Sequence, residues 1–246
     1  MPEIVVEGIS KTLSGLLTLG EINVQAHTQD FVGILGPSGC GKSTLFNIIS
    51  GLLLPDAGRV LIDGQDFTGV TGRVSYMHQK DLLLPSCSIL DNTSIPLILK
   101  GLPRKKAREM AAQYFTQFGL EGFEDYYPSR LSGGMRQRAA LLRTYLFSSD
   151  IMLLDEPFAS LDAITRRKMH IWLLDVLREL HPTILFITHD VDEALFLCDR
   201  VYVLSECPSE VRLEVEVPSS RLKSSHTITD PHHSQLRDEI LDALSI

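Results

Sequence analysis

One stretch decides the fold of this chain: Gly36-Pro37-Ser38-Gly39-Cys40-Gly41-Lys42-Ser43-Thr44. It fits the pattern G-x-x-x-x-G-K-[ST] and lies between an apolar run that predicts a strand, residues 31–35, and a segment that predicts a helix, residues 42–50. The glycines let backbone N–H groups wrap a phosphate chain, and the helix N-terminus adds the positive end of a dipole. The stretch therefore predicts a phosphate-binding loop on an α/β fold.

Two side chains of this phosphate loop carry chemistry of their own. Lys42 is expected to reach the β- and γ-phosphates of a nucleotide, and the Ser43 hydroxyl is expected to bind Mg²⁺. Cys40 is interpreted as a small residue that fills a tight turn rather than as a redox sensor. The residues predicted to contact the nucleotide are Gly36, Pro37, Ser38, Gly39, Cys40, Gly41, Lys42, Ser43 and Thr44.

Two carboxylates stand at the end of another apolar run. Residues 151–154 predict a buried strand, and Asp155 and Glu156 follow it directly. Asp155 is expected to hold the Mg²⁺ shell, and Glu156 to face the γ-phosphate and polarise an attacking water. Paired acids at a strand end are not specific alone, because helix caps look similar. Together with the phosphate loop they predict hydrolysis.

Two further polar residues follow predicted strands. His189 comes after the apolar run 183–187, at the sheet edge where ligands bind in α/β folds. Gln79 follows the predicted strand 74–77, and by itself it reads equally well as a surface amide. His189 therefore gains a functional interpretation from its position, whereas Gln79 needs other support.

A second phosphate-binding device opens the predicted helix 134–147. The stretch Leu131-Ser132-Gly133-Gly134-Met135 places a Ser-Gly-Gly turn at a helix N-terminus, where free N–H groups attract an anion. This turn has no phosphate of its own, because the phosphate loop already supplies the nucleotide site. A chain with both devices is expected to complete its active site with a second copy of itself.

The order of the predicted elements indicates an α/β core with two additions. Continuous apolar runs at 151–154, 183–187 and 201–204 alternate with predicted helices at 163–180 and 191–198, which is typical of a parallel sheet. Short alternating runs nearer the N-terminus predict an antiparallel β region, and they lie at 4–6, 22–25 and 60–62.

The segment between residues 81 and 149 shows no clear strand and carries predicted helices at 103–118 and 134–147. We therefore expect a single domain over 1–246. The expected parts are an α/β core with its antiparallel region at 1–80 and 150–205, an inserted helical lobe at 81–149 and a short tail at 206–246. The tail is expected to hold a strand at 211–217 and a helix near 234–244.

Composition narrows the function classes. The net charge of -8 and pI near 5.5 argue against a general nucleic-acid binder, which normally shows a basic face. The N-terminus lacks the pattern of a signal peptide, and no apolar stretch approaches the roughly 18 residues needed to cross a bilayer. Four scattered cysteines without a CxxC pair fit free thiols in a reducing cytoplasm.

Taken together, these motifs closely resemble the nucleotide-binding subunit of ATP-binding cassette (ABC) transporters over almost the whole chain. The matches in family order are residues 36–44 with the Walker A loop, Gln79 with the Q-loop glutamine, residues 131–135 with the signature motif, residues 153–157 with Walker B, residues 160–162 with the D-loop and His189 with the switch histidine. The signature motif discriminates, because other P-loop ATPases lack it.

The resemblance implies a P-loop NTPase (RecA-like) core and a head-to-tail homodimer that sandwiches two ATP molecules with Mg²⁺. It implies that Ser132, Gly133, Gly134 and Asp162 act on the ATP held by the partner subunit. It also implies catalytic roles for Glu156, His189, Gln79 and Lys42, and metal binding by Ser43, Gln79 and Asp155.

The chain departs from the family at the nucleotide base. The family usually has an aromatic residue that stacks on adenine, and the matching position here is Leu13. Leucine packs against a base without π-stacking, so base selectivity is expected to be looser, with ATP preferred and modest use of GTP.

Residues 77–85, 132–143 and 161–172, and the tail with Thr229-Asp230-Pro231, are similar to the importer group for nitrate, sulfonates, taurine and thiamine-pyrimidine precursors. This implies a motor subunit on the cytoplasmic face of the plasma membrane, bound to a transmembrane permease that works with an extracytoplasmic solute-binding protein. Two alternatives stay open: a non-transport ATPase of the iron–sulfur assembly type and an exporter motor subunit.

Overall fold

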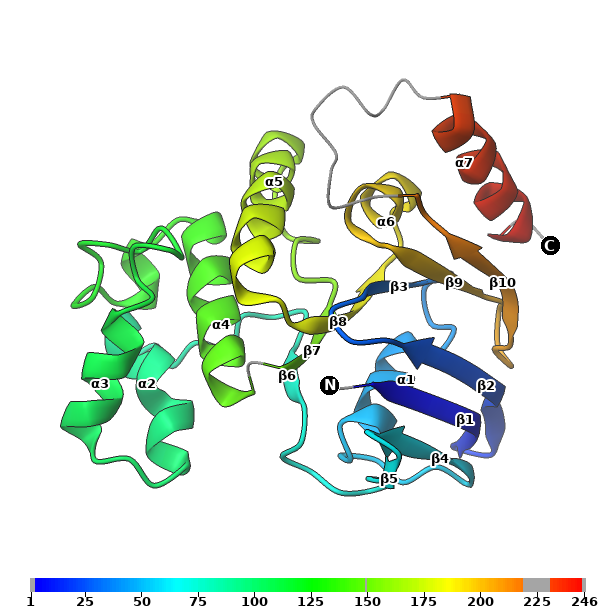
Figure 1. The fold of residues 1–246 in the computed structure, drawn as a ribbon, viewed down its shortest axis with the longest axis horizontal. Helices are drawn as coiled ribbons and strands as arrows, with labels where there is room; N and C mark the ends of the chain where they lie inside the picture. The colour runs from blue at the N-terminus through cyan, green and yellow to red at the C-terminus, as the bar shows by residue number, and fades with distance from the viewer. Residues whose placement is uncertain (1–2, 149, 219–230, 245–246) are drawn as a thin grey trace. The chain divides into compact units, whose positions relative to one another are not determined.

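The computed structural model describes residues 3–148, 150–218 and 231–244, which belong to two compact units (Figure 1). The first unit combines Met1–Arg73 with His181–Ile246, and the second is Val74–Leu180. The phosphate loop and His189 lie in the first unit, whereas the two carboxylates and the signature motif lie in the second. The chain therefore divides its predicted site residues between the two units.

The first unit contains an antiparallel sheet with the strand order β2-β1-β4-β5. Its strands are β1 (Ile4–Leu13), β2 (Leu16–Ala26), β4 (Ala57–Ile62) and β5 (Gln65–Asp66). β1 and β2 meet in a two-residue hairpin turn, where Ser14 and Gly15 both have positive φ, 50° and 82°. The predicted strands 4–6 and 22–25 were too short, because the hairpin end is exposed and lacks the alternating burial that marks a strand in sequence.

The same unit contains β3 (Phe31–Leu35), β8 (Thr183–Thr188), β9 (Arg200–Leu204) and β10 (Val211–Glu216). β3 is parallel to both β8 and β9, and β10 pairs with β9 in the antiparallel sense. Every residue of β3 and β8 is buried, which explains why the sequence shows continuous apolar runs there rather than alternation. These four strands confirm the predicted ones to within a residue.

The described part of the first unit also contains three helices: α1 (Lys42–Ile49), α6 (Val191–Leu197) and α7 (Pro231–Leu244). α1 begins directly after the phosphate loop, and α6 follows β8. α7 contacts α6, β9 and β10, and a hydrogen bond from Arg237 Nε to Asp192 Oδ1 (3.0 Å) joins it to α6 (Figure 1). The helix α7 thus packs on α6 and on the β9–β10 edge of the sheet, where β9 is the parallel neighbour of β3.

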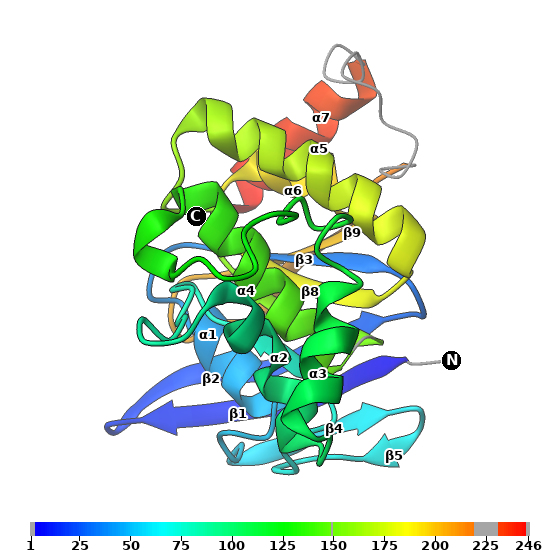
Figure 2. The same ribbon diagram turned by 90° about the vertical axis from the view of Figure 1, so that its left-hand side faces the viewer.

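The second unit is mainly helical (Figure 2). Its elements are the parallel pair β6 (Ser75–Met77) and β7 (Ile151–Asp155), the helices α2 (Ile89–Leu99), α3 (Arg104–Ala112), α4 (Gly133–Phe147) and α5 (Ala163–Leu180), and the 3₁₀ turn η1 (Pro128–Arg130). α4 contacts α2, α5 and β6. As predicted, the described residues between 81 and 148 form no strand.

One predicted helix of this unit was too long, and another helix was not predicted. The helix expected over 103–118 ends at Ala112, and turns follow that bring Phe115 and Phe118 into the core, where each is almost fully buried. The helix α2 was not predicted, and it contains Pro96, a residue type that is unfavourable inside a helix. Its start had a readable signal, since Ser88 Oγ caps the helix by accepting from Asp91 N at 3.1 Å.

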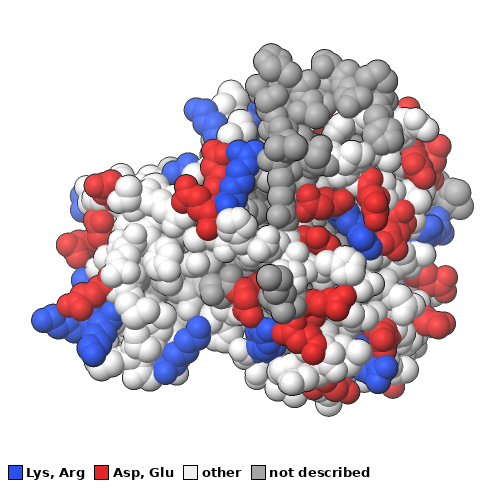
Figure 3. Space-filling view, viewed as in Figure 1, with Lys and Arg blue, Asp and Glu red and all other residues white. Residues whose placement is uncertain are grey.

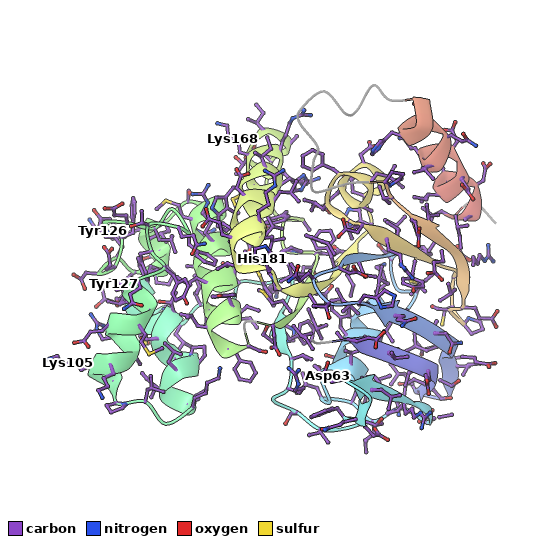
Figure 4. All side chains as sticks on the ribbon, in the orientation of Figure 1. Asp63, Lys105, Tyr126, Tyr127, Lys168 and His181 are labelled. Carbon is purple, nitrogen blue, oxygen red and sulfur yellow. The ribbon has the colours of Figure 1, made fainter. Side chains whose placement is uncertain are left out.

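Charge is distributed differently on the two units. Acidic side chains outnumber basic ones on the visible face of the first unit, whereas basic side chains gather at the α3 end of the second (Figure 3). Lys105 on α3 belongs to this end, and the half-exposed Tyr126 and Tyr127 also lie at the outer surface of the helical part (Figure 4). Among the described residues, no helix combines the length and the apolar character that a membrane span requires.

Candidate functional site

The phosphate loop joins β3 to α1 in the first unit. Gly41, the N-cap residue of α1, has φ 103° and provides no side-chain cap, so the N-terminal end of the helix stays open to an anion. Lys42 begins the helix, and Ser43 beside it is exposed. The loop therefore offers backbone donors, an ammonium group and a hydroxyl within a few residues.

The side chain of Lys42, which is predicted to bind phosphate, lies inside the phosphate loop. Its side chain is only 6% exposed, and Nζ donates to the carbonyl oxygens of Gly36 (2.7 Å) and Pro37 (2.8 Å). An ammonium group in this position lies among the loop's own backbone groups. A phosphate group that binds Nζ would therefore replace these carbonyl oxygens as hydrogen-bond acceptors, rather than replacing water molecules.

His189 leaves the sheet beside the phosphate loop. β3 and β8 are parallel neighbours in which Leu35 pairs with Thr188, so Gly36 and His189 follow at the same edge of the sheet. The backbone around His189 is fixed by the start of α6. Thr188 Oγ1 donates to Glu193 and accepts from Asp190 N (3.0 Å), and Asp190 Oδ1 accepts from Glu193 N (3.1 Å). The structure thus brings His189 and the phosphate loop together.

The second unit brings together the two carboxylates and Gln79. Asp155 ends β7 and is 6% exposed, and Glu156 follows it. Gln79, which follows the neighbouring strand β6, donates from Nε2 to Glu156 Oε2 at 3.2 Å. Glu156 has φ 43°, a conformation that costs energy for a residue with a side chain and that is common at functional sites.

Tyr76 is a residue of this cluster that the sequence analysis missed. Its hydroxyl donates to Asp155 Oδ2 at 3.2 Å. Burial raises the pKa of Tyr76, and the charge of Asp155 and the hydrogen bond to it raise this pKa further, so the hydroxyl keeps its proton. No short motif marks Tyr76 in the sequence, because its contact with Asp155 joins residues 79 positions apart.

The residues predicted to act on the partner's ATP also form one group in the second unit. Ser132 caps α4 by accepting from Met135 N (3.3 Å), and Asp162 caps α5 by accepting from Thr165 N (3.0 Å). A side-chain carbon at Gly133 would lie 3.2 Å from Leu161 Cδ2, and one at Gly134 3.3 Å from Thr165 Cγ2. The glycines thus allow the signature turn, Ser132–Gly134, to lie against the start of α5.

Asp162 is held ionised by the same geometry. The side-chain and backbone hydrogen bonds of Thr165 lower the pKa of Asp162 below its ordinary value. This carboxylate is exposed, so it is available to another molecule while it caps α5.

Two arginines that the sequence analysis missed fasten the segment after Gln79 to α4. Arg143 donates from Nη2 to the carbonyl oxygen of Asp81 (2.6 Å) and from Nη1 to that of Leu82 (2.8 Å), and Arg136 Nε lies 3.3 Å from Asp81 Oδ2. Leu82 has a positive φ of 47° at this attachment. The helix that begins with the signature turn is therefore tied to the strand end that carries Gln79.

Leu13 lies at the β1–β2 hairpin and is 37% exposed. The adjacent strand β2 packs on the phosphate loop, since a side-chain carbon at Gly41 would lie 2.7 Å from Leu19 Cδ2. The phosphate loop, His189 and Leu13 thus all belong to the first unit. Gln79, the carboxylates and the signature turn belong to the second unit.

The family model described as ABC transporter matches residues 19–159, which is more than half of the chain. The chain belongs to the ABC transporter family. As an ATP-binding cassette of this family it is an ATPase. None of its four cysteines, all of which the structure describes, forms a disulfide.

Individual relatives agree with this assignment. The cassette is 44% identical over 213 residues to the formylaminopyrimidine import ATP-binding protein ThiZ of Halalkalibacterium halodurans, covering 86% of this chain and 83% of the relative. It is 40% identical over 215 residues to the taurine import ATP-binding protein TauB of Pseudomonas aeruginosa, covering 85% and 81%. Both alignments span most of each protein.

A similar solved structure is the dimeric, post-hydrolysis state of the ATP-binding cassette MJ0796 bound to ADP and Pi. It has a TM-score of 0.75 and 29% identity, covering 88% of this chain and 99% of that one. The structural likeness confirms the predicted fold class, an α/β P-loop NTPase core with an antiparallel β region and an inserted helical lobe.

The close packing at Gly41 leads to a prediction about the phosphate loop. Gly41→Ala places a methyl group against Leu19 and Thr18 and forces alanine to φ 103°, whereas Gly39→Ala meets nothing within 4 Å and is strained only by its φ of 81°. We expect Gly41→Ala to lower the free energy of unfolding by about 2–3 kcal/mol, and Gly39→Ala by about 1 kcal/mol. Urea denaturation measures both.

For the same two variants, equilibrium binding of a fluorescent ATP analogue measures how well the phosphate loop still binds nucleotide. We expect a larger loss of affinity for Gly41→Ala than for Gly39→Ala. Equal losses of stability and affinity in the two variants would show that the contact with β2 does not shape the loop.

Proposed function

We propose that this chain is the ATP-hydrolysing motor subunit of an ABC importer for a small solute, with nitrate, a sulfonate or taurine, or a thiamine precursor as candidate solutes. The observation that carries the proposal is the high identity to import ATP-binding proteins over most of both chains. This similarity favours an import role over the iron–sulfur assembly type and over an exporter. The match that the tail residues Thr229 and Asp230 make to this importer group lies outside the described residues.

The proposed nucleotide site begins with the phosphate loop. Its backbone N–H groups surround the phosphates, and Lys42 exchanges its two loop carbonyls for β- and γ-phosphate oxygens. Leu13 packs against the base without stacking, so discrimination between ATP and GTP rests on weaker contacts than an aromatic ring supplies. Residues 36–44 and Leu13 thus bind the nucleotide at its two ends.

The residues proposed for Mg²⁺ fit that ion, because all of them offer the hard oxygen donors that it prefers. They are the Ser43 hydroxyl, the Asp155 carboxylate and the Gln79 side-chain amide. When bound, the ion neutralises charge that develops on the phosphate oxygens. The protein's part is to hold these oxygens in place around the ion.

For hydrolysis we propose that Glu156 orients and polarises the attacking water, with Gln79 holding its carboxylate. His189, on the same sheet edge as the phosphate loop, contacts the γ-phosphate side of the site. Its place is fixed by the hydrogen bonds of Thr188, Asp190 and Glu193 at the start of α6.

We propose a head-to-tail homodimer in which the signature turn and Asp162 of one subunit complete the ATP site of the other. The packing of the signature turn against the start of α5 supports this, because it gathers these residues on one surface with a helix N-terminus among them. ATP then links the subunits, and loss of the γ-phosphate releases them. A solved cassette dimer bound to ADP and Pi is consistent with the arrangement.

We further propose that residues 1–246 form a single ATPase domain, in which 1–80 and 150–205 make the core, 81–149 the helical lobe and 206–246 the tail. The contacts of α7 with α6, β9 and β10 support including the tail. The partners proposed for the motor are transmembrane permease subunits, with a solute-binding protein acting through them and no nucleic acid. Its place is peripheral, on the cytoplasmic face of the plasma membrane.

Copurification tests the transport role. The tagged full chain is expressed in its native host, membranes are solubilised in mild detergent, and the proteins recovered with it are identified by mass spectrometry. We expect a multi-spanning permease in stoichiometric amount, and stimulation of ATPase activity when the matching solute-binding protein and solute are added. Recovery only with soluble scaffold proteins overturns the importer role, and stimulation by solute from the cytoplasmic side without a binding protein indicates an exporter.

A further inference from the structure

The strand β6 holds both carboxylates of the neighbouring strand end. Gln79, just beyond β6, bonds to Glu156, and Tyr76 within β6 bonds to Asp155 (3.2 Å each). β6 is parallel to β7, with Tyr76 paired to Leu153, so the long tyrosine side chain reaches forward to the carboxylate two residues further along β7. The proposed function uses Gln79 and leaves Tyr76 without a role.

The position of Tyr76 is fixed by its surroundings. Its neighbours Ser75 and Met77 are buried at 0% and 3% exposure on the opposite face of β6. Ser75 Oγ donates to the carbonyl oxygens of Ile151 (2.9 Å) and Ser148 (3.1 Å), which ties β6 to the start of β7. The Tyr76 ring packs on His78 with ring centroids 4.0 Å apart. The hydroxyl is thus presented to Asp155 from a rigid base.

We propose that Tyr76 is a positioning residue for the Mg²⁺ site. It donates to Oδ2 of Asp155, fixes the rotation of the carboxylate and so orients this carboxylate for the ion or for one of its waters. Carboxylates that bind metals are commonly hydrogen-bonded in this way, and loss of such a partner weakens metal binding. A phenol suits the task because it is a neutral donor: a lysine or arginine there would cancel the charge that attracts the ion.

The inference rests on the proposed role of Asp155 in the Mg²⁺ shell, and Tyr76→Phe tests it by removing only the hydroxyl. The measured quantity is the dissociation constant of a fluorescent ATP analogue in EDTA divided by its dissociation constant in saturating Mg²⁺. This ratio states how much Mg²⁺ tightens nucleotide binding. We expect Tyr76→Phe to lower this ratio about tenfold, with binding in EDTA unchanged. Tyr114→Phe, the same change at another half-buried tyrosine of the second unit, is expected to keep the wild-type ratio.

Asp155→Asn and the double variant distinguish the possible failures. If Tyr76 acts through Asp155, the double variant has the ratio of Asp155→Asn alone, because the losses of a coupled pair are not additive. A wild-type ratio in Tyr76→Phe, or additive losses in the double variant, overturns the inference. A wild-type ratio in Asp155→Asn instead overturns the proposed metal role of Asp155. Circular dichroism and the EDTA constant confirm that each variant is folded.

Discussion

Replacing Glu156 by glutamine is expected to reduce ATP hydrolysis by about 10²–10⁴-fold while ATP binding is retained. The amide keeps the shape of the side chain and can still bond to Gln79, but it is too weak a base to polarise a water molecule. Because the γ-phosphate persists, the variant is also expected to accumulate as an ATP-bound dimer in Mg²⁺. Phosphate release and size-exclusion chromatography measure the two effects.

Glu179→Gln is the matched control for this variant. Glu179 is an exposed glutamate of α5 that accepts from Gln117 Nε2 at 2.6 Å, so the chemical change is the same and lies on the same unit. We expect wild-type hydrolysis from it. Wild-type hydrolysis by Glu156→Gln would remove Glu156 from the mechanism. If Glu156→Gln binds ATP but two ATPase subunits do not associate, either alone or in the complex with the permease, the ATP-linked dimer is contradicted.

Mixed dimers of two inactive variants are expected to regain activity. Lys42→Ala loses the ammonium that binds the phosphates, and Ser132→Asp places a negative charge against the γ-phosphate. Aspartate still caps α4, so this change spares the helix. In a head-to-tail dimer that contains one subunit of each kind, one site carries both defects and the other carries neither. We expect about half of the wild-type ATPase rate, since one of two symmetric sites is intact.

The two subunit types carry different affinity tags, so that only mixed dimers are purified, within the assembled transporter. The control pairs a wild-type subunit with one that carries both substitutions. Both of its sites then hold one defect, and we expect it to be inactive. If the signature turn served the ATP of its own subunit, the outcomes would be reversed: the first mixture would be inactive and the control active.

The sequence was a good guide wherever a local pattern carries the structure. The strands β3, β8 and β9 and the helix α5 were predicted to within a residue, because full burial leaves continuous apolar runs and a long amphipathic helix keeps its period. The hairpin of β1 and β2 was underestimated, since its exposed end rests on cross-strand pairing rather than on burial.

The helical part was harder to predict because its contacts are not local. α2 contains a proline and is stabilised by its cap at Ser88 and by packing on α3 and α4. The turns after Ala112 are set by two phenylalanines that enter the same core. The helix α2 and these turns depend on contacts between residues far apart in the chain, so no local sequence pattern predicts them.

In the candidate site, too, residues in local motifs were predictable and residues placed by long-range contacts were not. The phosphate loop, Asp155, Glu156, His189 and the signature turn could be named from the sequence, because each is a short motif at a strand end or helix start. Tyr76 and Arg143 could not. Only their hydrogen bonds mark them: that of Tyr76 to Asp155, 79 positions away in the chain, and those of Arg143 to the carbonyl groups of Asp81 and Leu82, 62 and 61 positions away.

The sequence by itself thus determined the kind of protein, a P-loop ATPase, and it predicted that a second phosphate-binding turn serves a partner subunit. Its motifs are local because a phosphate is bound by consecutive backbone N–H groups. Only the tertiary structure decided which side chains hold the reacting groups in place. It showed that β6 supports both carboxylates and that α4 is tied to the segment after Gln79. Hydrogen bonds depend on distance in space, and folding alone brings such distant residues within reach.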